Sequence, residues 1–166
     1  MSYATVKSFL EQWKHESEAT SKMMASLTDA SLGQRVGPDD RTLGRIAWHV
    51  AQTVPEMMNR VGLDLPAIEG PPPARAAAVA AAYGKAAAAL AAAVTSKWTD
   101  ATLAQTDDMY GEKWTRATTL ACLVHHQIHH RGQMTVLMRQ AGLRVPGVYG
   151  PAREEWAAFG APAPEV

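Results

Sequence analysis

The feature that most constrains the fold of this chain is helical periodicity, which recurs in four separate segments. In residues 2–27, apolar side chains recur every three or four positions, as they do on one face of an amphipathic helix. Runs of β-branched residues with alternating polarity, which would indicate strands, are absent from the sequence. Three further helices are predicted over residues 42–62, 74–97 and 115–141, so the sequence predicts an all-α fold.

The connections between these helices are long and rich in helix breakers. Gly37 and Pro38 interrupt residues 33–40, three consecutive prolines end the linker 63–73, and residues 98–114 form another long connection. We expect Pro55 to kink the second helix or to end its regular part. Four helices joined in this way favour an antiparallel four-helix bundle. The whole chain, residues 1–166, is of single-domain size, with an irregular tail from about residue 143 that holds one short turn near Trp156.

Charge and cysteine content exclude several classes of protein. Sixteen basic residues balance sixteen acidic ones, so there is no positive excess to hold a nucleic acid. The single cysteine, Cys122, cannot form an internal disulfide, which favours a reducing compartment. The first residues lack a signal-peptide pattern, and the alanine-rich stretch 76–94 is interrupted by Tyr83, Gly84 and Lys85. We therefore expect a cytoplasmic protein with no membrane span.

The main functional signal is a histidine cluster in the last predicted helix. His125 and His129 are four residues apart, as are His126 and His130. Residues four apart share one face of a helix, so either pair can bring two imidazole nitrogens to one divalent cation at about 2.0–2.1 Å. Both faces continue into apolar positions, so periodicity favours the pair His126 and His130 only slightly.

A catalytic metal site of this kind needs a third protein ligand, and two other histidines are available. His15 lies among charged residues, which indicates a solvated face. His49 follows Trp48 in an apolar stretch of the second helix, where a buried imidazole needs a partner. That partner could be a hydroxyl or carbonyl group, or it could be a metal ion shared with the histidine pair. The spacing by itself does not decide between these two.

Two longer motifs resemble those of the DinB-like (DinB/YfiT-like) family. Residues 123–134, continuing through residues 137–151, are similar to the family's C-terminal motif, in which a histidine pair is followed by Arg-Gly-Gln. Residues 41–50, which contain Trp48 and His49, are similar to its second-helix motif. The two motifs together are specific, whereas two histidines four apart would be a weak signal alone.

The resemblance implies a four-helix bundle that holds a divalent metal ion, often nickel or zinc, through three histidines. By motif position these are His49, His126 and His130, because His130 directly precedes the Arg-Gly-Gln sequence. His125 and His129 then become neighbours of the ligands that support them or pack beside them. The resemblance also implies a homodimer and a small-molecule substrate.

Three neutral ligands leave the full charge of the ion at an open position, where water or a thiol loses a proton more readily. Two reaction classes follow: metal-dependent hydrolysis, and transfer of a thiol. Relatives that resemble thiol-dependent S-transferases favour the second, with a low-molecular-weight thiol as co-substrate. Two alternatives stay open: a non-catalytic, stress-associated metal-binding protein, and a histidine cluster that binds no metal.

No general base is evident in the sequence, because the histidine pair lacks the glutamate of the zinc-protease motif. Gln52, Glu56 and Arg131 are the candidate catalytic residues. Gln52 lies one turn and Glu56 two turns beyond His49, and Arg131 could bind an anionic group. Both Arg131 and Gln133 are assigned mainly to helix packing. Other side chains that could lie near the metal are Trp48, Tyr110, Trp114 and Tyr149, as the lining of a pocket, and Cys122, as a minor candidate ligand.

Overall fold

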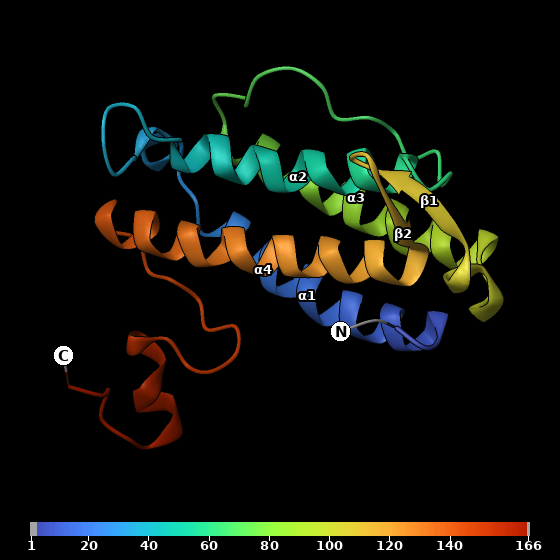
Figure 1. The fold of residues 1–166 in the computed structure, drawn as a ribbon. Helices are drawn as coiled ribbons and strands as arrows, with labels where there is room; N and C mark the ends of the chain where they lie inside the picture. Colours follow the sequence, from blue (N-terminus) through green and yellow to red (C-terminus); the bar gives the residue numbers. More distant parts are fainter. Residues whose placement is uncertain (1–2, 166) are drawn as a thin grey trace.

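A computed structural model describes residues 3–165, in which four long helices pack side by side (Figure 1). These helices are α1 (Val6–Ala25), α2 (Leu43–Asn59), α3 (Ala76–Lys97) and α4 (Arg116–Gln140). The prediction of a mostly helical fold is confirmed, with helix ends within a few residues of those expected. Ser2, where the first helix was expected to begin, lies outside the described residues.

Threonine caps fix where three of the four helices begin. Thr5, Thr42 and Thr115 directly precede α1, α2 and α4, and each Oγ1 accepts the backbone N–H three residues later at 3.0–3.1 Å. Such a cap satisfies one of the backbone donors that a helix start leaves unpaired. Helix α2 continues past Pro55 to Asn59, so this proline does not end the helix.

The prediction that the helices are all antiparallel is wrong for α2 and α3, which run in the same direction (Figure 1). The linker after α2 turns back along it: Asn59 bonds to the carbonyl of Leu65, and Trp48, near the start of α2, donates to the carbonyl of Gly70 at 2.9 Å. Helix α3 therefore begins at the end where α2 also begins. The cause is the length of this linker, which is sufficient for a crossover connection.

A two-stranded antiparallel hairpin spans residues 106–115, where no strand was predicted, so the strictly all-α assignment is wrong there. Strands β1 (Thr106–Met109) and β2 (Glu112–Thr115) are joined by Tyr110 and Gly111, with φ angles of 59° and 89°. Two consecutive positive φ angles are typical of a tight hairpin turn. The strands are short and mostly polar, so they lack the alternating apolar pattern that identifies strands in a sequence.

Short 3-10 helices occupy parts of the remaining connections. They are η1 (Asp29–Gly33), η2 (Asp100–Ala104) and η3 (Arg153–Phe159). A Cβ atom on Gly44 would lie 3.0 Å from the Cβ of Leu32, so glycine lets η1 approach the start of α2 closely. Helix η3 belongs to the tail, which extends away from the four long helices (Figure 1).

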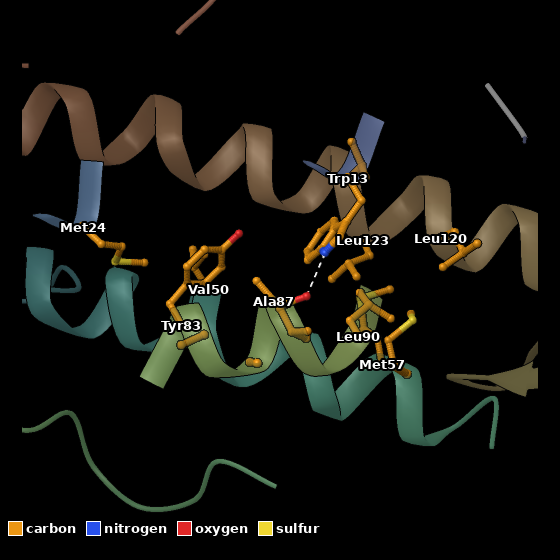
Figure 2. Packing of buried hydrophobic residues seen from close by; sticks show 14 of the residues in the cluster. Trp13, Met24, Val50, Met57, Tyr83, Ala87, Leu90, Leu120 and Leu123 are labelled. Atoms are coloured by element: carbon orange, nitrogen blue, oxygen red, sulfur yellow. Dashed lines mark hydrogen bonds between the residues drawn. The ribbon is translucent and has the colours of Figure 1, made fainter. Parts of the chain in front are cut away.

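The core lies between the four long helices and is closed by large apolar side chains. Trp13, Tyr83, Leu90 and Leu123 are fully buried in it, with Tyr83 beside Val50 and the other three farther along the helices (Figure 2). The indole N–H of Trp13 donates to the carbonyl of Ala87 at 3.1 Å, which pairs its polar atom inside the core (Figure 2). The small side chains of α3 allow this close approach of α1 and α3.

By length and composition alone, α3 could span a membrane, with a mean hydropathy of 1.6. This is more apolar than the sequence interpretation allowed, because alanine dominates the helix. In the fold, α3 packs against α1 and α2 and buries Val79, Tyr83, Leu90 and Val94, and 33% of its apolar window is buried.

Candidate metal centre

Helices α2 and α4 bring three histidines together at their contact. His126 is central: its Nε2 lies 3.2 Å from Nε2 of His49 and 3.1 Å from Nε2 of His130. One nitrogen from each of the three lies within 4.8 Å of the others, and no other group of three or more possible metal ligands is found in residues 3–165. These residues are the three that the family motifs indicated.

The spacing of these nitrogens fits a shared divalent ion. Two nitrogens at about 2.05 Å from one ion lie about 3.3 Å apart at a tetrahedral angle and about 2.9 Å apart at a right angle. The observed 3.1 and 3.2 Å fall between these values. Both contacts of His126 therefore suit a shared metal ion, and the ligand atoms of His49 and His130 lie within 4.8 Å of each other.

Gln133 determines which nitrogen of His130 carries a proton. The amide oxygen of Gln133 lies 2.7 Å from Nδ1 of His130, and an amide oxygen only accepts, so Nδ1 is the donor. The Nε2 of His130 therefore presents a lone pair toward His126. The Nδ1 of His126 is buried without a hydrogen-bond partner. This Nδ1 is not one of the converging nitrogens. The Nε2 of His126 carries either one proton or one lone pair, so a linear hydrogen bond serves only one of its two contacts, whereas a cation could take a lone pair from each Nε2.

All three imidazoles are held in the neutral form that binds metals. Burial lowers the pKa of His49 and of His126 to about 4, and the nearby His130 adds to the shift in both. Burial also lowers the pKa of His130, although its bond to Gln133 acts in the opposite direction. The ligand set is therefore uncharged at neutral pH, and protons do not compete with a metal ion there.

The other histidines lie outside this cluster. His125 and His129 are exposed on α4, although the His129 ring lies 4.9 Å from that of His130. His15 is exposed on α1, as its polar surroundings predicted, and its ring lies 6.2 Å from that of Tyr149. The structure thus separates the two histidine pairs that periodicity alone could barely distinguish.

The cluster is accessible through a cleft on the His49 side. This cleft has a volume of about 290 Å³ and is lined by His49, Gln52, Thr53, Glu56 and Ile68. Both candidate residues that follow His49 on α2 are thus beside the cluster. A small molecule entering the cleft would meet His49 and the carboxylate of Glu56 together.

Gln52 and Glu56 both have partners in the fold. The Gln52 amide donates to the carbonyls of Ile68 and Gly70, both at 3.2 Å, and so ties the linker to α2. The Glu56 carboxylate accepts from Arg60 and from the hydroxyl of Tyr110, both at 2.7 Å. Glu56 is therefore positioned at the cleft but is already hydrogen-bonded through both oxygens.

Arg131, the third candidate, points toward α1 and not into the cleft. It forms an ion pair with Glu16, and both side chains are almost fully buried. Arg131 also donates to Thr20 at 3.0 Å and to the hydroxyl of Tyr149 at 2.9 Å. These contacts favour a role in joining α4 to α1 and to the tail.

The remaining side chains proposed for the pocket have different positions. Tyr110, at the hairpin tip, donates a hydrogen bond from its hydroxyl to Glu56, which lines the cleft. The guanidinium of Arg60 lies over the Tyr110 ring. Its ring lies 6.0 Å from that of Trp114. The expectation that Tyr149 lines this pocket is wrong, because it contacts Glu16 on α1. The indole N–H of Trp48 donates a hydrogen bond to the carbonyl of Gly70 in the linker.

Cys122 is half-buried and is not part of the ligand group. Burial raises the pKa of its thiol above the ordinary value, so the thiolate that a metal would need is disfavoured. Sequence reasoning missed Gln133 as the partner of His130. The signal was available, because Gln133 is three residues after His130 and so shares its helix face.

Known proteins match this chain over its whole length. The sequence model of the DinB family matches residues 1–165. The "Uncharacterized protein YrdA" of Bacillus subtilis (strain 168) is 45% identical over 166 residues, with 99% of each chain covered.

Two crystal structures share the fold. A DinB-like protein from Bacillus cereus ATCC 10987 is similar with a TM-score of 0.86 and 44% identity, covering 89% of this chain and 99% of that one. The DinB-like protein YjoA of Bacillus subtilis has a TM-score of 0.68 at 13% identity, covering 85% of this chain and 97% of its own. The second similarity concerns the fold alone.

Proposed function

The chain belongs to the DinB family. From this membership and the geometry of the three histidines, we propose that it is a metal-dependent enzyme. The proposed reaction transfers a low-molecular-weight thiol to a small-molecule substrate. The proposal rests mainly on the convergence of three neutral imidazoles beside an open cleft. The Nε2 of His126 lies 3.2 Å from that of His49 and 3.1 Å from that of His130. His49, His126 and His130 would hold the ion. Imidazole ligands suit zinc and nickel, and we propose one of these two metals.

A divalent ion in this position would supply a Lewis acid that favours the thiolate form of a thiol at the open position. A thiol needs little further help, because its ordinary pKa of about 8.5 is far below that of water. Hydrolysis depends more on a general base. The best candidate base, Glu56, already accepts hydrogen bonds from Arg60 and Tyr110. This difference favours thiol transfer over hydrolysis.

The proposed reaction is a substitution at an electrophilic atom of the substrate. The sulfur atom of the thiol forms a bond to that atom, and the leaving group departs with the electron pair of the bond that breaks. The thiol proton passes to solvent. No oxidant or reductant is required.

Residues around the cluster would position the reactants. Gln133 holds His130 in the tautomer that presents its Nε2 lone pair. Gln52 fixes the linker that forms one wall of the cleft, and Glu56 would orient a polar group of the substrate or thiol beside His49. The single thiol and the balanced charge of the chain suit a cytoplasmic location, which we include in the proposal.

Activity assays with defined metal content test the proposal. Zinc-loaded and nickel-loaded protein is mixed with cysteine or glutathione and the electrophile monobromobimane, and thioether formation is followed by fluorescence. We expect a metal-dependent rate that His126→Ala abolishes. His125→Ala is the matched control, because His125 also has a histidine four residues later but is exposed, and it should leave the rate unchanged.

A p-nitrophenyl ester assay on the same samples tests the alternative, a metal-dependent hydrolase. Metal-dependent ester hydrolysis without thiol transfer would replace the proposed reaction by hydrolysis. Metal binding without either activity across a broad set of electrophiles and esters would favour a non-catalytic, stress-associated metal-binding protein.

A further inference from the structure

A second and larger cleft opens on the other side of the histidine cluster. It has a volume of about 650 Å³ and is bounded by the start of α2 and by the later turns of α4. His130 lines this cleft, whereas His49 lines the smaller one. The histidine cluster therefore lies between two clefts, one lined by His49 and the other by His130.

The walls of this second cleft are mainly apolar. Ile46 and Leu137 are buried beneath it, while Val36 and Val136 are 70% and 54% exposed. Two exposed valines at the rim of a cleft that ends at a histidine offer a surface for an apolar group of a ligand. A wholly polar ligand would leave this surface without a contact.

The second cleft has one cationic and one acidic side chain in its lining, Arg41 and Asp40. Arg41 lines it and is exposed, and within residues 3–165 no carboxylate lies at ion-pair distance from its guanidinium. Its charge reaches the cluster, because Arg41 contributes to lowering the pKa of both His49 and His130. A guanidinium without an acidic partner beside apolar walls is suited to a ligand carboxylate.

The two clefts differ in their charged side chains. Glu56 lines the cleft beside His49, and Arg41 lines the cleft beside His130. Asp40 also lines the second cleft but forms no ion pair with Arg41, and its negative charge disfavours a doubly charged group more than a singly charged one. A monoanionic molecule would therefore place its acidic group at Arg41 and away from Glu56.

We propose that the cleft formed by Arg41, Val36, Ile46, His130, Val136 and Leu137 binds the substrate as an amphiphilic monocarboxylate. The carboxylate pairs with Arg41, and the apolar part lies on the valines and Leu137. This inference rests on the proposed function, since it assigns the substrate class of that same site. Arg41 is a positioning residue that binds the substrate away from the reacting atom.

Isothermal titration calorimetry with octanoate tests this site. Octanamide has the same chain without the charge, and acetate has the charge without the chain. We expect octanoate to bind to the zinc-loaded protein about 10-fold more tightly than octanamide, as a charge-assisted pair allows. Arg41→Gln should remove that difference, and Arg41→Lys should keep part of it. Arg144→Gln, a change at an exposed arginine outside the cleft, should have no effect.

The same titrations on chelator-treated protein separate this inference from the proposed function. Loss of octanoate binding on chelation, with no effect of Arg41→Gln, would show that the carboxylate binds the metal, and it would overturn the inference alone. Equal binding of octanoate and octanamide would also overturn it. Octanoate binding that needs Arg41 in a protein that never retains a metal would support the cleft and overturn the metal-dependent function.

Discussion

The buried ion pair between Arg131 and Glu16 gives the sharpest stability prediction, for the variant Arg131→Met. Only 4% of the Arg131 side chain and 3% of the Glu16 side chain are exposed. Methionine would leave the Glu16 carboxylate buried, with the hydroxyl of Tyr149 as its remaining side-chain donor. Removing one partner of a buried pair costs about 3–5 kcal/mol. Because Tyr149 is itself 64% exposed and lets water approach, we expect about 3 kcal/mol.

Urea denaturation followed by circular dichroism measures this loss. In a domain of this size, about 3 kcal/mol corresponds to a melting temperature lower by about 6–12 °C. The double variant Glu16→Leu, Arg131→Met should recover most of the stability, because it removes both charges together. Metal content should not change in the folded single variant, since Arg131 contacts α1 and not the cluster. A loss below about 1 kcal/mol, or loss of metal from folded protein, would refute this reasoning.

Three further predictions concern the metal centre. Gln133→Leu removes the acceptor that orients His130. Chelator competition should show zinc affinity lower by about 10-fold, the small end of the usual loss when such a partner is removed, because Gln133 is exposed. Unchanged zinc affinity would contradict the orienting role. In metal-free protein, the pKa of His49 and His126 is about 4 when folded and about 6.5 when unfolded, so the unfolded state binds more protons between these values. Stability should therefore fall as pH drops from about 6.5 to 4, and the double variant with asparagine at both positions should flatten this decrease; parallel pH curves for the two proteins would count against neutral imidazoles. Zinc should raise the melting temperature of the wild type through linkage, and an identical temperature with and without bound zinc would exclude any stabilising effect of the ion.

Helix positions were predictable from the sequence because burial of one face imposes a visible period. The apolar stretch around His49 suffices to place α2 and its histidine, whereas the cap by Thr42 became evident only in the structure. The relative direction of α2 and α3 was not predictable. It depends on hydrogen bonds from Trp48 and Asn59 to the linker, which a local pattern does not contain.

The hairpin was missed for a different reason. Its strands are four residues each, and its turn uses Tyr110 and Gly111 in place of the more common asparagine or aspartate before glycine. The fold nevertheless uses this turn to bring the Tyr110 hydroxyl to Glu56, more than fifty residues earlier in the chain. Such long-range contacts follow from tertiary packing.

The candidate site was predicted in its residues but not in its surroundings. Spacing limited the ligands to two possible pairs on one helix, and the family motifs selected His126 and His130 with His49. Burial in the structure makes the same selection, because His125 and His129 are exposed. The second cleft and Arg41 could not be predicted, since they depend on how α2 and α4 meet.

The central claim is that His49, His126 and His130 together hold one divalent ion. The most direct measurement is the metal content, by elemental mass spectrometry, of untagged protein purified without added metal and compared with His126→Ala and His125→Ala. We predict about one zinc or nickel ion per chain in the wild type and in His125→Ala, and almost none in His126→Ala. Absence of metal from the wild type even after reconstitution, or its retention by folded His126→Ala, would contradict the account.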